Sequence, residues 1–486
     1  MKKLYYVFVF LILLVLFVTG TDSCNDKRRQ RSDQKLANSY CGSCHKLPNP
    51  ASLTKDVWRD NIMSRMSDYY NWTEVSRFKY ANKKIFEDRG AIPMSDTIWA
   101  ALQHYFVSGG LDEPIVRAYD ALPIQTHFQI QQVDNICSGR GITAVAIDEN
   151  NDNIIAACNS QLLTINQEGL LSKVSNSGGL VSGIFPKDTS SAYILDPGIL
   201  DPHNEALGSM NGWNQQTDNI ETIYKGLQRP VYLSQSDNDI FISEFGDETG
   251  GLGQLQFDSK KYLNASKLPG AYKSFIYDYD KDGTDEVIVM FAQAMEGIYV
   301  REVEAVDQTF VPLLSFLPEW GISDVDTTDV NLDGWTDLVI VNGDNADFSL
   351  IPKAYHGVRV YLNNQNGGYE ESFSFPMHGA SQVRALDANN DGFDDLLVGA
   401  YFAIDDRDRL MILLHNADPN NLAYAPHRIA EASLGRWMVI NKGDVDGDGD
   451  LDAIIGSFVI SKKSASINDK EVGDQTDLLI LLNKSK

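Results

Sequence analysis

Four short, related segments in the second half of the chain constrain its fold more than any other feature. They begin at Asp278, Asp329, Asp387 and Asp444, so successive copies start 51, 58 and 57 residues apart. Each copy has Asp or Asn at positions 1, 3 and 5, Gly at position 6 and an acid at position 9, and then runs into a short apolar segment such as residues 338–341. A repeat of this length, with several strands in each copy, is typical of a β-propeller.

The spacing of the polar residues in these segments fits a hard divalent cation. Oxygen ligands at positions 1, 3 and 5 wrap the ion, Gly permits the sharp turn, and the last acid closes the shell. An EF-hand is excluded, because its loop lies between helices and places Glu at position 12, where the first copy has Val289. Asx-rich turns without metal are the alternative for any single copy. We predict up to four Ca²⁺ ions, held by Asp278, Asp280, Asp282, Glu286, Asp329, Asn331, Asp333, Asp337, Asp387, Asn389, Asp391, Asp395, Asp444, Asp446, Asp448 and Asp452.

Weaker copies of the motif precede these four and set the expected number of blades. Residues 148–153 lack the Gly and the closing acid, and Asp188 and Asp237 stand before short apolar runs. Counting every copy gives seven units over residues 113–486, with about 55 residues in each. We therefore predict an all-β domain with seven blades over residues 113–486.

The motifs of this domain resemble the FG-GAP repeats, which are VCBS-type and integrin-α-like. The resemblance implies a seven-bladed propeller with calcium in the loop that joins the first two strands of a blade. It is specific in its motifs over residues 278–458 and weak before residue 270. A two-domain β-sandwich is the alternative architecture.

The first 31 residues are typical of an export signal and a tether. Lys2 and Lys3 precede an apolar run over residues 4–18, which has the length of a signal-peptide core and is short for a membrane-spanning helix. We predict a signal peptide over residues 1–23, with a retained membrane anchor as the alternative. Cys24 resembles the lipidated cysteine of bacterial lipoproteins, which implies a lipid anchor followed by a basic tether over residues 24–31.

The sequence Cys-Gly-Ser-Cys-His at residues 41–45 is the attachment motif of c-type haem. Cys41 and Cys44 can add to the two vinyl groups of one porphyrin, and His45 then reaches the iron as the proximal ligand. A zinc site is disfavoured, because the chain has no second Cys-x-x-Cys. Helical spacing on both sides of the motif predicts a small all-α cytochrome c domain over residues 32–112, with one covalent haem c.

The sixth ligand of the haem iron is open between two methionines. The segment resembles mono-haem domains in which a Trp-x7-Met element follows the haem motif, here Trp58 and Met66, and this implies Met66 as the distal ligand. Met94 is the alternative, although it also fits a hydrophobic staple ahead of the N-cap Ser95. His104 or an open position is a further alternative.

Cys137 and Cys158 are two further cysteines, 21 residues apart in the β-rich region. In an oxidising compartment they can pair as a disulfide. Two separate buried thiols are the alternative.

Polar residues follow the apolar strands of several repeats, on the side opposite the predicted calcium loops. Glu244, Glu296, Asp344 and His356 are weak candidates for a polar funnel near the propeller axis, where loops converge around ligands. Carboxylates beside a His can serve general acid–base chemistry. Solvated turns and hydrogen bonds that close the blades are the simpler explanation for each of these residues.

Charge and motifs together narrow the function. The formal net charge is −26, from 41 basic and 67 acidic side chains, which argues against nucleic-acid binding. A haem domain fused to such repeats resembles bacterial envelope proteins of Bacteroidetes type. We expect an exported electron-transfer protein, in the periplasm or at the cell surface, whose propeller docks a redox partner protein, a small molecule or a glycan. A haem-linked dehydrogenase with its substrate site on the propeller, and an adhesion or carbohydrate-binding propeller with an accessory haem, are the alternatives.

Overall fold

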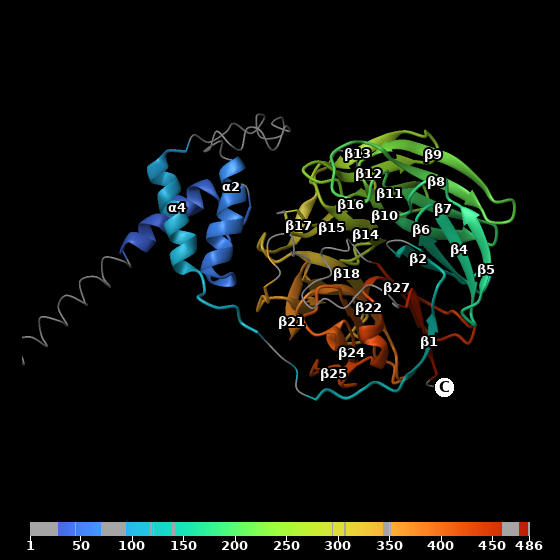
Figure 1. Cartoon of the computed structure of the whole chain (residues 1–486). Coiled ribbons are helices and arrows are strands. Elements are labelled where there is room, and N and C mark those ends of the chain that lie inside the picture. Colours follow the sequence, from blue (N-terminus) through green and yellow to red (C-terminus); the bar gives the residue numbers. More distant parts are fainter. Residues whose placement is uncertain are drawn as a thin grey trace, which may run out of the picture. The chain divides into compact units, whose positions relative to one another are not determined.

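The chain divides into two compact units, one formed mainly by residues up to Ile115 and the other mainly by residues from Val116 onward. The computed structural model describes residues 28–43, 45–69, 94–116, 119, 121–138, 141–293, 295–305, 308–343, 349, 351–458 and 476–484 (Figure 1). The predicted signal peptide, Cys24, Cys44 and Asp344 lie outside these residues. Within the described ranges, no helix is both long enough and apolar enough to cross a membrane.

Short helices form the first unit. One helix covers residues 28–40, and the others are η1 (Pro50–Ser52), the π-helical turn η2 (Val57–Ile62), α2 (Met63–Tyr69) and α4 (Asp96–Gly109). As predicted, Ser95 caps α4, because its side chain accepts a hydrogen bond from the backbone N–H of Ile98. The helices share a small apolar core, in which Trp58 stacks on Phe106 with 4.7 Å between the ring centroids.

Seven antiparallel sheets of four strands form the second unit, and we number them as blades 1 to 7 (Figure 1). Blade 1 contains β2 (Ile142–Asp148), β3 (Asn153–Cys158), β4 (Gln161–Asn166) and β5 (Leu171–Asn176); blade 2 contains β6 (Gly183–Asp188), β7 (Ser191–Asp196), β8 (Gly208–Asn214) and β9 (Asn219–Leu227); blade 3 contains β10 (Pro230–Gln235), β11 (Asp239–Glu244), β12 (Gly251–Gln256) and β13 (Tyr262–Ser266); blade 4 contains β14 (Ala271–Tyr277), β15 (Glu286–Phe291), β16 (Gly297–Glu302) and β17 (Val311–Ser315); blade 5 contains β18 (Ile322–Thr328), β19 (Asp337–Asn342), β20 (Gly357–Asn363) and β21 (Tyr369–Pro376); blade 6 contains β22 (Ala380–Leu386), β23 (Asp395–Ala400), β24 (Leu410–His415) and β25 (Tyr424–Arg428); blade 7 contains β26 (Trp437–Gly443), β27 (Asp452–Ser457), β28 (Leu478–Asn483) and β1 (Phe128–Val133).

The packing of the blades explains the pattern of apolar residues along the chain. In blades 4 to 7 every residue of the second strand is buried, because neighbouring blades cover both of its faces. These strands are the continuous apolar runs of the sequence, whereas a strand with one solvent-exposed face would alternate apolar and polar residues. The first strands contact one another in a closed circle, from β2 through β6, β10, β14, β18, β22 and β26 back to β2.

The two ends of the propeller chain meet in blade 7. Strand β1 pairs with β28 in antiparallel register, with Phe128 opposite Asn483 and Val133 opposite Leu478. A disulfide joins Cys137, just after β1, to Cys158 at the end of β3, with 5.7 Å between the Cα atoms. The first strand of the propeller chain, β1, therefore completes the last blade, blade 7. The disulfide links the segment just after β1 to β3 of blade 1.

The propeller with seven blades is confirmed, and the alternative of two sandwiches does not hold. The weaker copies of the motif that precede the four long ones lie at the turns of blades 1 to 3, but these turns are shorter. The connections after β2, β6 and β10 have only four, two and three residues, whereas those after β14, β18, β22 and β26 each have eight. A turn of two to four residues is too short to wrap its side chains around an ion.

Candidate cation-binding loops

Four loops of equal length connect the first and second strands of blades 4 to 7. We name them by their blades: loop 4 (residues 278–285), loop 5 (residues 329–336), loop 6 (residues 387–394) and loop 7 (residues 444–451). The acid that closes each motif is the first residue of the following strand. The four repeated segments of the sequence therefore occupy equivalent places in four consecutive blades.

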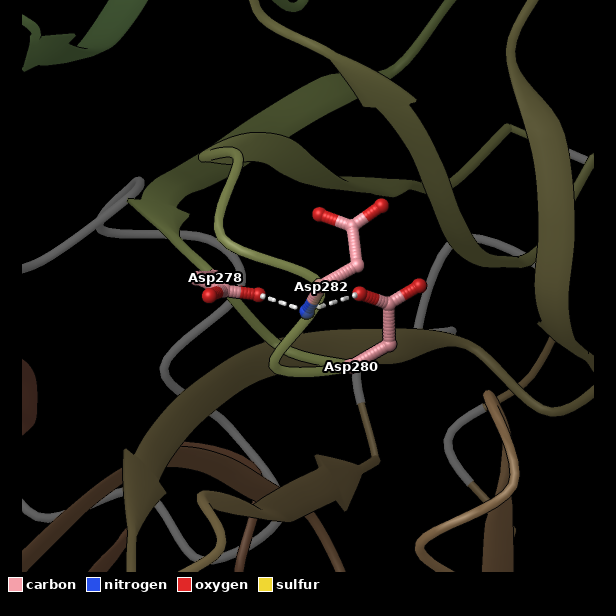
Figure 2. A group of neighbouring side chains, drawn as sticks. All are labelled: Asp278, Asp280 and Asp282. Atoms are coloured by element: carbon pink, nitrogen blue, oxygen red, sulfur yellow. Dashed lines mark hydrogen bonds between the residues drawn. The ribbon is translucent and has the colours of Figure 1, made fainter.

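The acid at position 1 organises the backbone of each loop. In loop 4, Asp278 accepts hydrogen bonds from the backbone N–H groups of Asp282 (3.1 Å) and Gly283 (2.9 Å). Asp280 also accepts from Asp282 at 3.2 Å, so the Asp282 nitrogen lies between two carboxylates (Figure 2). Loops 5 and 6 repeat these three bonds, at distances between 2.7 and 3.2 Å. Each loop thus folds its backbone around the side chain that begins it.

Gly at position 6 is required by the backbone conformation. Gly283, Gly334, Gly392 and Gly449 have φ values of +96°, +83°, +89° and +89°, in the region that residues with a Cβ atom rarely adopt. Their N–H groups donate to the acid at position 1 in every loop. The recurring Gly therefore allows the turn that brings positions 1, 3 and 5 together.

Carboxylate oxygens gather in two of these loops. In loop 4 the oxygens of Asp278, Asp280 and Asp282 lie within 4.8 Å of one another, and in loop 7 the same is true of Asp444, Asp446 and Asp452. Like charges at this distance repel, and a divalent cation between them removes the repulsion. In loops 5 and 6 the Asn at position 3 donates its amide to the Asp at position 5, at 3.0 Å in both.

The acid at position 9 has a second role that its place in the motif does not reveal. Asp337, Asp395 and Asp452 are fully buried, and one oxygen of each accepts the backbone N–H of position 2. Their other oxygen accepts an N–H from the end of the third strand. Burial raises the pKa of Asp337 and Asp395 to about 7 and that of Asp452 to about 6. The closing acid therefore fastens the loop to its blade.

A cluster of buried charges lies on the first strands of the same four blades, and no motif pointed to it. Asp324 of β18 pairs with Lys273 of β14 and Arg384 of β22, and Asp326 of β18 pairs with Lys442 of β26. Both aspartates also accept backbone N–H groups of β22. The side chains of this axial cluster join blades 4, 5, 6 and 7, the blades that carry the long loops.

Three of the four candidates for a polar funnel are buried and hold the blades together. Glu244 accepts hydrogen bonds from the backbone N–H of Gln228, which lies just before β10, and from the hydroxyl of Tyr262 in β13. Glu296 accepts the N–H of Ile322 at 2.6 Å and so joins blade 4 to blade 5. These bonds support the simpler explanation given by the sequence.

His356 has a comparable structural place. Its Nδ1 accepts the N–H of Gly379 at 3.3 Å, and its ring stacks on His378 with 4.9 Å between the centroids. Burial holds the pKa of His356 well below its usual range. Because Nδ1 accepts a hydrogen bond, the proton of the neutral ring is on Nε2.

The haem motif follows directly on the helix of residues 28–40. Cys41 continues the helical hydrogen bonding through its N–H, which donates to the carbonyl of Ala37 at 2.8 Å. The Nδ1 atom of His45 lies 2.8 Å from the carbonyl oxygen of Lys46. Because a carbonyl only accepts, Nδ1 is the donor in this contact, so in the neutral ring Nε2 is the nitrogen that can bind a metal. The chemistry of His45 therefore fits an axial iron ligand.

The candidates for the second axial ligand lie on or near the later helices. Met66 of α2 and Met94, just before Ser95, are both half-buried. Met63 is buried in the core, and His104 bonds to Asp33 through Nδ1 at 2.7 Å. Met66 stays the predicted distal ligand, with Met94 as its alternative.

Comparison with known proteins concerns the propeller. A family model of the FG-GAP-like repeat matches residues 329–398, which contain loops 5 and 6. Integrin alpha-8 of Mus musculus is 24% identical over 249 residues, covering 47% of this chain and 22% of the integrin. Integrin alpha-8 of Gallus gallus is 25% identical over 253 residues, covering 48% of this chain and 23% of the integrin. The match spans less than a quarter of the length of these relatives.

Solved structures that match this chain have low TM-scores and low sequence identity. The computationally designed Ika8 protein has a TM-score of 0.41 at 11% identity, covering 67% of this chain and 83% of that one. The N-terminal domain of Nup159 has a TM-score of 0.43 at 10% identity, covering 75% and 98%. The repeat match and the loop geometry agree on an FG-GAP-like repeat in blades 5 and 6, and the propeller is similar in sequence to part of integrin alpha-8.

Proposed function

We propose that the propeller is a calcium-stiffened binding module, exported and joined to a domain that carries haem c for electron transfer. The observation that supports the calcium part is the fourfold recurrence of one loop geometry. In blades 4 to 7 an acid at position 1, a Gly with positive φ and a buried closing acid return at equivalent places. Cation binding at these loops would stiffen the propeller that docks a partner or ligand.

Calcium titration of the full-length protein tests this part. After removal of divalent ions with EDTA and dialysis, isothermal titration calorimetry should give four Ca²⁺ ions per chain. A variant with Asp278→Asn, Asp329→Asn, Asp387→Asn and Asp444→Asn should bind none, because position 1 organises each loop. Asp188→Asn, at the end of β6 just before a two-residue turn of blade 2, is the matched control and should keep all four. Wild-type protein that binds no calcium would contradict the proposal.

The haem part is supported by the tautomer of His45. Cys41 and Cys44 would hold the porphyrin covalently, His45 would be the proximal ligand through Nε2, and Met66 or Met94 would lie opposite. When bound, the haem supplies one-electron redox chemistry. The Lys46 carbonyl would orient the imidazole and increase its basicity through the bond to Nδ1.

Absorption spectroscopy tests the haem part. Protein produced with a c-type haem maturation system should show the α-band of a c-type cytochrome on reduction, and a pyridine haemochrome of the thioether type. The double variant Cys41→Ser with Cys44→Ser should lose the covalent haem. Haem that acid-acetone extracts from the wild-type protein would contradict covalent attachment.

The two alternative functions, a dehydrogenase and an adhesion or carbohydrate-binding propeller, predict different results with the same proteins. A dehydrogenase would reduce the haem when its substrate is added, and a screen of sugars and alcohols would reveal this. An adhesion or carbohydrate-binding propeller would keep glycan binding in the Cys41→Ser, Cys44→Ser variant. A lipid on Cys24 would place either protein at a membrane, and mass spectrometry of the mature N-terminus decides that point.

A further inference from the structure

Asn363, the last residue of β20, connects two neighbouring calcium loops. Its backbone N–H donates to the closing acid Asp337 of loop 5 at 2.8 Å. Its side-chain Nδ2 donates to the carbonyl oxygen of Tyr279 in loop 4 at 2.9 Å. Tyr279 is position 2 of loop 4, and its own N–H donates to the closing acid Glu286 at 3.1 Å. Asn363 is only 4% exposed, so neither bond competes with water.

The same device recurs two blades further on. Asn483, the last residue of β28, donates its backbone N–H to Asp452 of loop 7 at 2.8 Å. Its Nδ2 donates to the carbonyl oxygen of Asp387, position 1 of loop 6, at 2.9 Å. Asn483 is completely buried. Two buried asparagines at equivalent strand ends thus hold the closing acid of their own loop and the backbone of the loop before it.

Blade 6 has a different residue at this place. His415, the last residue of β24, donates its N–H to Asp395 at 2.6 Å, as the asparagines do. Its ring, however, stays in its own blade: Nδ1 accepts the N–H of Ala417, and the ring stacks on Phe393 of loop 6. Among the described residues, His415 makes no side-chain bond to loop 5. The buried bridges therefore join loop 4 to loop 5 and loop 6 to loop 7.

We propose that Asn363 and Asn483 are positioning residues that couple the calcium loops in two pairs, loop 4 with loop 5 and loop 6 with loop 7. The inference rests on the proposed function, in which these loops bind calcium. An ion in loop 4 fixes the peptide of Tyr279, which fixes the amide of Asn363 and thereby the N–H that holds Asp337. The second ion of a pair then meets a loop that is already ordered and loses less conformational entropy on binding.

Loop 5 contains its own reporter for this coupling. Trp335 is position 7 of the loop, and its N–H donates to Asp333 at 2.9 Å, whereas the other three loops have Thr284, Phe393 and Asp450 at position 7. Terbium is a hard, luminescent ion that takes oxygen ligands as calcium does. The part of the tryptophan-excited emission that Trp335→Phe abolishes therefore reports ions beside this residue, and its midpoint in wild type and variants follows the affinity of loop 5.

The experiment is a Tb³⁺ titration of the full-length protein with this emission as the signal. Asp278→Asn, which disables loop 4, should move the loop 5 midpoint to about five- to tenfold higher Tb³⁺. Asp387→Asn, which disables loop 6 outside the pair, should leave it unchanged. Asn363→Leu, which has a similar size but no amide, should also raise the midpoint and reduce the effect of Asp278→Asn to less than half.

Asn483→Leu is the matched control, because it makes the same change at the equivalent place of the other pair. It should leave the loop 5 midpoint unchanged, so a shift common to both Leu variants would indicate general destabilisation and overturn the pairing. Equal midpoints for the wild type and Asp278→Asn would also overturn it, whether or not Asn363→Leu folds. Independent binding of ions at four sites would refute the coupling but leave the calcium proposal standing. Absence of any ion binding would refute both.

Discussion

Blades 1 to 3 and blades 4 to 7 differ in how they accommodate acidic side chains between their first two strands. At the turn between the first two strands, the acids of blades 1 and 2 accept hydrogen bonds from neighbouring side chains. Asp148 accepts from the amides of Asn151 and Gln215, and Asp188 accepts from Ser190 and Ser191. Hydrogen bonds from these serines lower the pKa of Asp188 to about 2.

The later blades place two to four acids in each eight-residue loop and one more at the start of the following strand, and in the motifs of loops 4 and 7 three carboxylates lie within 4.8 Å of one another. Fourteen carboxylates stand at the ligand positions of the four loops. We therefore expect the long acidic loops to take up a cation, whereas a short turn balances its carboxylate with hydrogen bonds from the protein. One half of the ring should therefore depend on calcium and the other half should not.

Calcium removal should give the largest effect. A site filled at one hundred times its Kd stabilises the folded state by about 2.7 kcal/mol, so emptying four should lower the Tm of the propeller by more than about 10 °C. Differential scanning calorimetry in calcium and in EDTA measures the shift. Magnesium added back in place of calcium is the control for ionic strength. An unchanged Tm would abolish the contrast between the two sets of blades.

Loss of a closing acid should come next. Asp395→Ala leaves the buried N–H groups of Ala388 and His415 without their acceptor, so unfolding should become easier by about 2–4 kcal/mol. Asp188→Ala, at an exposed turn of blade 2, is the paired control and should have a small effect. Urea denaturation at saturating calcium measures both. Similar losses for the two variants would show that the two kinds of turn do not differ.

Acid should weaken the axial cluster of blades 4 to 7. Burial alone would raise the pKa of Asp326, but attraction by Lys273, Lys442 and Arg384 outweighs it and lowers the pKa to about 2. Since this lies below the ordinary value, the carboxylate stabilises the fold above about pH 4, and the contribution is lost as the pH falls toward 2.

Chemical denaturation across this pH range, in wild type and in Asp326→Asn, measures the loss from this group. The difference in stability between the two proteins should shrink as the pH falls from about 4 to about 2. Asp237→Asn, in the turn after β10, is the control and should show no such trend. A constant difference between wild type and Asp326→Asn would contradict the assignment.

The smallest effect is expected in blade 1. Gln215→Ala removes one of the two amides that hold Asp148, with an expected loss of about 1 kcal/mol. The loss should be the same in calcium and in EDTA, because no ion takes part in this turn. A loss that depends on calcium would mean that blade 1 also holds a cation.

Local repeats made the long loops and the number of blades predictable from the sequence. Asp, Gly and the closing acid recur at fixed spacing, and the same spacing sets the backbone of each loop. The short turns of blades 1 to 3 were counted as weaker copies because residues 148–153 resemble the motif in composition, whereas their length depends on where β3 begins, which the sequence does not show.

The remaining features could not be predicted from the sequence, because they depend on pairs of residues that lie far apart along the chain. Lys273 and Asp324 are 51 residues apart, and neither stands in a motif, so only the circle of first strands brings them together. Glu244 and Glu296 looked like site residues because they are polar and follow buried strands. Their partners include backbone N–H groups and, for Glu244, the Tyr262 hydroxyl, and a sequence pattern displays neither kind of pairing.

Hydrogen–deuterium exchange of the full-length protein, followed by mass spectrometry with calcium and with EDTA, tests the central claim most directly. The account predicts that calcium slows exchange in loops 4 to 7 and in β15, β19, β23 and β27, and leaves the turns after β2, β6 and β10 unchanged. Equal protection of both sets of blades, or no change in either, would contradict it.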